Sequence, residues 1–120
     1  MTVTVQIFGT NKSKDTQKAV RFCKERRLDL QFVDLRKRDI APGELNRFVQ
    51  KFGLDAVIDK DGKAYEKAGL EYMRVPEEQM IDKLIDNPKL LKQPLMRAGN
   101  VLSIGWDEAL WRDWFEKQKP

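Results

Sequence analysis

The chain has no histidine and only one cysteine, Cys23, among its 120 residues. Without an imidazole there can be no Ser-His-Asp or Cys-His machinery, and the usual histidine-containing zinc sets are excluded. A single cysteine cannot form an internal disulfide, a CxxC pair or the cysteine cluster of an iron–sulfur site. The sequence therefore predicts a protein with no metal and no cofactor.

Long apolar runs are missing as well. No stretch approaches the roughly 18 apolar residues that would span a bilayer. The first six residues lack the basic start and apolar stretch of a signal peptide, so we expect a cytoplasmic protein that has no contact with a membrane. The net charge is only +4, and opposite charges interleave, as in residues 24–27. That pattern is typical of a solvated mixed surface, so direct nucleic-acid binding is not expected.

The first third of the chain predicts a strand, a helix and a second strand. Apolar and polar residues alternate from Val3 to Phe8, and the pattern ends at Gly9. A helix is expected over about 15–27, with Ser13 or Asp15 as its N-cap, and a strand over 30–34. Such a unit places its two strands parallel.

The rest of the chain predicts a helical segment, a hairpin and a last helix. Pro42 can begin a helix and Gly53 can end one, and residues 54–87 are rich in helical patterns. Gly99-Asn100 is a hairpin turn signal, and Asp107 can cap the final helix. We predict a single α/β domain over 1–120. Its fold is thioredoxin-like, with a mixed four-stranded sheet (β-α-β … β-β-α) and a helical insertion at about 42–87.

In this fold the loop after the first strand, residues 9–15, is the expected place for chemistry. It exposes the backbone N–H groups of a helix N-terminus, which can hold a small anion or lower the pKa of a thiol. A capped helix start with polar flanks explains the same residues, and Asp15 would repel an anion. The candidate binding residues of the loop are Thr10, Asn11, Lys12, Ser13 and Thr16.

The cysteine and the tryptophans do not indicate a second functional site. Cys23 lies about two turns into the predicted helix beside Phe22, where a small core residue is expected rather than a reactive thiolate. Trp111 and Trp114 have the spacing of an amphipathic helix that packs on a sheet. We therefore assign these side chains to the core.

Several segments resemble the arsenate reductase ArsC/Spx family along the whole chain. The sequence QIFG at 6–9 precedes a loop with Ser13 and Thr16, and NPKLLKQPL at 87–95 is similar to the family pattern NPxLixRPi. Further matches lie at 33–34, 62–65, 69–70, 78–84 and 104–106. The resemblance implies a thioredoxin-like fold with a helical insertion, and a cis-proline at Pro94 beside the active site.

The departures from the family pattern fall on its chemistry. Ser13 stands where the family carries its nucleophilic cysteine, and Thr16 where many Spx-type members have a second one. Gln17 replaces a basic residue, and Gln93 replaces the arginine before the cis-proline. A serine cannot form the mixed disulfide of thiol reduction, and glutamine brings no charge to an oxyanion. Ser13 is either the natural residue of a member that has lost redox activity or an engineered Cys→Ser change in a reductase.

Three functions follow from the resemblance. The first is a protein with a degenerate active-site loop that works in binding or regulation. The second is an arsenate or thiol-disulfide reductase, supplied by an external thiol donor, whose catalytic cysteine is replaced by Ser13. The third is an Spx-like regulator that binds the RNA polymerase α subunit, because Gly53 matches the Spx glycine that approaches this subunit. A glycine helix end explains Gly53 equally well.

Overall fold

A four-stranded mixed sheet forms the centre of the protein in its computed structural model, which describes residues 3–118. The strands lie in the order β2-β1-β3-β4. β2 pairs parallel with β1, β3 pairs antiparallel with β1, and β4 pairs antiparallel with β3. The predicted thioredoxin-like fold is confirmed. The strands are β1 (Val5–Gly9), β2 (Leu30–Asp34), β3 (Leu95–Ala98) and β4 (Val101–Ile104).

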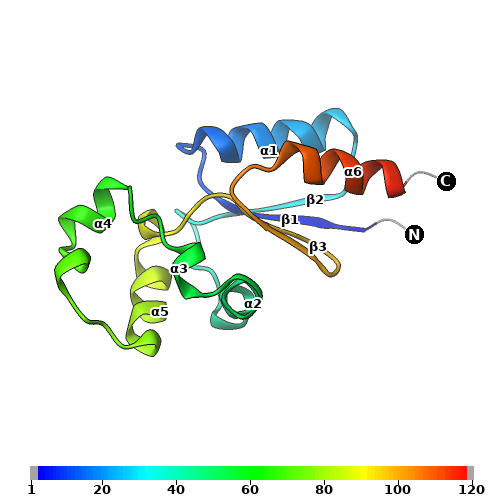
Figure 1. Ribbon diagram of the computed structural model, residues 1–120. Coiled ribbons are helices and arrows are strands. Elements are labelled where there is room, and N and C mark those ends of the chain that lie inside the picture. Colours follow the sequence, from blue (N-terminus) through cyan, green and yellow to red (C-terminus); the bar gives the residue numbers. More distant parts are fainter. Residues whose placement is uncertain (1–2, 119–120) are drawn as a thin grey trace.

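Two helices, α1 (Lys14–Glu25) and α6 (Glu108–Gln118), cover one face of the sheet (Figure 1). Val5 and Ile7 alternate toward these helices and are fully buried there. Trp111 and Trp114 pack in the same core, as their spacing predicts, with 1% and 8% of their surface exposed. The indole Nε1 of Trp111 donates to Ser103 Oγ at 2.9 Å, so the buried polar end of the ring is satisfied.

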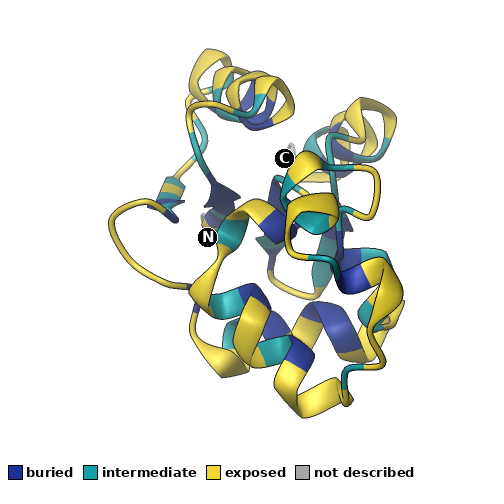
Figure 2. Cartoon of the chain, turned by 90° about the vertical axis from the view of Figure 1, so that its left-hand side faces the viewer, coloured by how far each residue is buried: buried dark blue, intermediate teal, exposed yellow. Residues whose placement is uncertain are grey.

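The helical insertion covers part of the opposite face. Phe8, which points away from Val5 and Ile7, meets Phe48 edge-to-face with ring centroids 6.3 Å apart. Figure 2 shows buried residues on the inner sides of these helices and exposed residues on their outer sides. The elements are α2 (Pro42–Phe52), α3 (Leu54–Val57), α4 (Lys63–Lys67), η1 (Leu70–Tyr72), α5 (Glu77–Asp86) and η2 (Pro88–Leu90), where η marks a 3-10 helix.

The end of α1 differs from the prediction by two residues. The helix ends at Glu25 because Arg27 takes a left-handed conformation with φ 55°. The N–H of Leu28 then donates to Cys23 O at 3.0 Å, and the N–H of Arg27 donates to Lys24 O at 3.1 Å. This pair of bonds is a Schellman motif, which usually has glycine at the left-handed position, so the sequence carried no glycine signal for it.

No helix within residues 3–118 is both long and apolar enough to cross a membrane.

Candidate active-site loop

The loop between β1 and α1 places Ser13 as the N-cap of α1. Ser13 has extended backbone angles (φ −81°, ψ 120°), and its Oγ accepts the backbone N–H of Thr16 at 3.2 Å. Its own N–H donates to Thr10 O at 3.1 Å, and its carbonyl accepts the N–H of Gln17 at 3.0 Å. Of the two N-caps that the sequence allowed, Ser13 is therefore the right one. Its hydroxyl already satisfies one of the free N–H groups of the helix.

Gln93 lies opposite the loop and is bonded to it. Its Oε1 accepts both the backbone N–H of Thr10, at 2.9 Å, and the hydroxyl of Thr10, at 3.2 Å. Its Nε2 donates to Pro88 O at 3.1 Å. The peptide bond between Gln93 and the buried Pro94 is cis, as the resemblance implied. The structure thus brings Thr10, Gln93 and Pro94 together beside the start of α1.

Thr16 is fully buried in the first turn of α1, under the loop. Its hydroxyl has no hydrogen-bond partner among the described residues. The side chain packs against Gly9, where a Cβ atom would lie only 2.6 Å from Thr16 Oγ1. Only a glycine at the end of β1 leaves room for this threonine.

The remaining loop residues are exposed. Asn11 and Lys12 form the turn before Ser13, and the side-chain Nε2 of Gln17 donates to the carbonyl of Asn11. Asp15, in the first turn of α1, lies 4.0 Å from Lys18, and both side chains are more than half exposed, so the pair contributes little. Within residues 3–118 there is no cluster of three or more His, Cys, Asp or Glu side chains that could hold a metal ion.

Cys23 lies outside this loop, in the core between α1, α6 and the sheet. It is 1% exposed, and burial raises the pKa of its thiol from 9.0 to about 11, against a smaller lowering by Arg26. A buried, protonated thiol is a poor nucleophile. The prediction that Cys23 is a core residue is confirmed.

Gly53 lies at the junction between α2 and α3, on the helical side of the sheet. It is exposed, and its backbone (φ 89°, ψ 155°) is open to glycine and strained for other residues. Its N–H donates to Val49 O at 2.8 Å, which ends α2 as the sequence predicted.

Known proteins resemble this chain in sequence and in fold. The sequence matches the model of the ArsC family over residues 8–114. The chain belongs to the ArsC family. Within related sequences, the global transcriptional regulator Spx 2 of Oceanobacillus iheyensis is 22% identical over 108 residues, which cover 88% of this chain and 79% of the relative.

Solved structures share the ArsC family fold at low sequence identity. The YFFB protein has a TM-score of 0.81 and 18% identity, with 91% of this chain and 96% of that chain covered. An arsenate reductase from Vibrio cholerae has a TM-score of 0.75 and 14% identity, with 97% and 98% covered. At these identities the likeness concerns the fold.

Sequence reasoning missed a second polar region in this ArsC family member. Gln6, Gln31 and Arg97 form a row across three strands, on the same face of the sheet as Phe8. The available signal was a glutamine at position 6 between apolar strand residues, but its neighbours depend on the strand register, which the sequence does not give.

Proposed function

We propose that this ArsC family protein acts by binding another molecule, and that it is not a thiol reductase. The observation that supports the proposal is that a serine, Ser13, begins α1 and that its hydroxyl oxygen accepts the backbone N–H of Thr16. A serine hydroxyl has no ability to form the mixed disulfide on which thiol reduction depends. A helix N-terminus alone does not activate it, and the chain has no histidine that could take its proton.

Gln93, opposite the β1–α1 loop, supports the same proposal. An oxyanion held in this loop would need N–H donors and a cation. The N–H of Thr10 is already bonded to the neutral side chain of Gln93 at 2.9 Å. In the family pattern an arginine at this position would bring charge and a two-pronged donor, and glutamine brings no charge.

The first experiment measures reduction directly. The purified protein is given arsenate, glutathione, a glutaredoxin, glutathione reductase and NADPH, with NADPH consumption as the readout, and in a separate assay a glutathione mixed disulfide replaces the arsenate. We expect no turnover above the protein-free control. Turnover by the unaltered sequence would refute the proposal.

A second experiment distinguishes a binding protein from a reductase that has lost only its catalytic cysteine. In a Cys23→Ala background, Ser13→Cys places the only thiol of the chain at the helix N-terminus, where its pKa should fall. We expect faster alkylation by iodoacetamide at pH 7 than for a free cysteine, but no arsenate reduction, because Gln93 holds no oxyanion. Arsenate turnover by this variant would support the alternative that a reductase has lost only its cysteine.

A regulatory role through the RNA polymerase α subunit is the second candidate. Two observations favour it. The first is the similarity to a relative that is named a global transcriptional regulator. The second is that Gly53, between α2 and α3, is exposed and has backbone angles that favour glycine. In a pull-down with the C-terminal domain of the α subunit, we expect binding that Gly53→Arg abolishes. Gly69→Arg is the matched control, because Gly69 also has a positive φ (68°) and a Cβ there meets no atom within 4 Å. Absence of binding by the unaltered protein would remove this candidate.

A further inference from the structure

A row of polar side chains crosses the face of the sheet that the helical insertion leaves open. Gln6 lies opposite Gln31 in the β1–β2 register and opposite Arg97 in the β1–β3 register. The side-chain Nε2 of Gln6 donates to Gln31 Oε1 at 2.8 Å, and its Oε1 accepts from Arg97 Nη1 at 3.3 Å. The row therefore fixes the position of one guanidinium group on the sheet surface.

Arg97 is held from a second side. Its Nε donates to Gly99 O, in the turn between β3 and β4, at 3.2 Å. The side chain is half-buried, and it makes no ion pair with an acidic side chain of residues 3–118. A guanidinium that is oriented but not neutralised retains N–H donors for a ligand.

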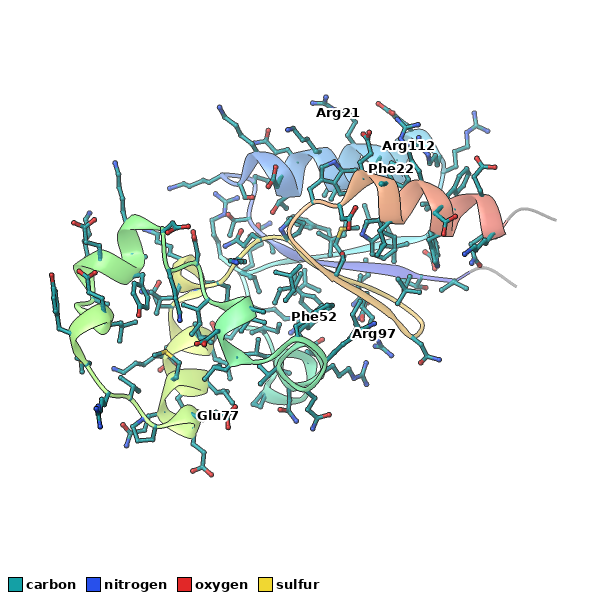
Figure 3. The ribbon with its side chains drawn as sticks, in the orientation of Figure 1. Arg21, Phe22, Phe52, Glu77, Arg97 and Arg112 are labelled. Atoms are coloured by element: carbon teal, nitrogen blue, oxygen red, sulfur yellow. The ribbon has the colours of Figure 1, made fainter. Side chains whose placement is uncertain are left out.

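Arg97 lines an open groove between the β3–β4 hairpin and α2. The groove has a volume of about 500 Å³. Figure 3 shows Arg97 on the side of the hairpin that faces α2 and Phe52, whereas Arg21 and Arg112 lie beyond the sheet on the side of α1 and α6. The described residues that line the groove are Arg47, Gln50, Lys51, Arg97, Gly99, Asn100 and Leu102.

The lining of the groove carries three positive charges and no negative charge. Arg47 and Lys51 are exposed on α2, one turn apart, and Arg97 faces them from β3. None of the lining residues named above is acidic, so three cations share this space without a counter-charge in the lining. Gln50 and Asn100 add amide groups that can donate hydrogen bonds. A second hollow of about 320 Å³ adjoins it through Arg97 and Gly99 and reaches Gln6 and Gln31.

We propose that this groove binds a small molecule that carries two or more phosphate groups. A phosphate carries more than one negative charge at neutral pH, which a carboxylate cannot match, and the guanidinium fork of Arg97 suits its oxygens. Cations on two elements match a ligand with more than one anionic group. The lining residues named above include no aromatic ring on which a nucleic-acid base could stack, so a single-stranded nucleic acid fits the groove less well than a polyphosphate. Leu102 is the one apolar side chain among them, so an apolar peptide also fits less well.

The experiment titrates the full chain with pyrophosphate at low salt, by calorimetry and by amide NMR shifts. We expect binding, with shifts in residues 47–51 and 97–102. Arg97→Gln and Lys51→Gln should each weaken it about tenfold or more, because each removes a charge-assisted contact. Lys51 is exposed on α2, so its variant tests the groove without a risk to the strand pairing. Lys83→Gln, at an exposed position of α5 outside the groove and the β1–α1 loop, is the matched control and should bind as the unaltered protein does.

Four results would overturn the proposal. They are an absence of pyrophosphate binding at millimolar concentration, amide shifts confined to residues 10–16, equal affinity for citrate, and tighter binding of a single-stranded oligonucleotide. The second would assign the anion to the β1–α1 loop. The third and fourth would assign the groove to carboxylates or to nucleic acid.

Discussion

Gln93 accepts the backbone N–H of Thr10 at 2.9 Å, across 83 residues of sequence. The same side chain donates to Pro88 O at 3.1 Å, so one neutral amide joins the β1–α1 loop to the segment that leads into β3. The amide at position 93 therefore acts as a structural brace between these two segments. A neutral amide brings no charge to an oxyanion, which supports the proposal that the protein is not a reductase.

The brace should contribute to stability. Gln93→Ala removes three hydrogen bonds and leaves the part-buried N–H of Thr10 without its partner. We expect the free energy of unfolding to fall by about 1–3 kcal/mol, measured by urea denaturation. Gln50→Ala, an exposed glutamine on α2, is the control and should change it by less than about 0.5 kcal/mol. Equal effects of the two variants would show that Gln93 does not act as a brace.

The buried hydroxyl of Thr16 should cost stability. It is fully buried and has no partner among the described residues, whereas valine has the same shape without the polar atom. Thr16→Val should therefore raise the free energy of unfolding by about 1 kcal/mol, measured by urea denaturation. Thr10→Val is the informative contrast, because it removes a hydroxyl that is bonded to Gln93 and should be destabilising. A loss of stability in Thr16→Val would mean that the hydroxyl has a partner.

The contact between Gly9 and Thr16 should appear as coupling between the two sites. A Cβ at position 9 would lie 2.6 Å from Thr16 Oγ1 and 2.9 Å from its Cγ2. Gly9→Ala alone should then lower the free energy of unfolding by about 1–3 kcal/mol through overpacking. In the background of Thr16→Ala, which removes both atoms, the same change should cost much less. A double-mutant cycle by urea denaturation gives the coupling energy, and additive effects would contradict the close contact.

The fold was predictable because its signals are local. Alternation from Val3 to Phe8 identified β1, and Pro42 and Gly53 marked both ends of α2. The end of α1 was missed because the left-handed residue of its Schellman motif is Arg27. This position is usually a glycine, and an arginine in the sequence does not indicate a left-handed backbone.

The site was predictable only in part, because its contacts are distant in sequence. Ser13 could be read as an N-cap, since a cap bonds within its own first turn. The bond from Thr10 to Gln93 depends on how β3 pairs with β1, and so does the row that ends in Arg97. Strand register over such separations is set by the packing of both faces and not by a local motif.

The buried thiol of Cys23 should make stability depend on pH in the alkaline range. Its pKa in the folded protein is about 11, raised mainly by burial, against an ordinary value of 9.0. Above pH 9 the unfolded chain releases the proton and the folded protein keeps it, so the unfolded state becomes more favourable as pH rises. The contribution is complete below pH 9 and is lost between about 9 and 11, with an upper limit of about 3 kcal/mol. The measurement compares urea unfolding of the unaltered protein and Cys23→Ala from pH 8 to 11, since lysine titration affects both alike. Parallel curves would show that the thiol titrates normally in the folded state.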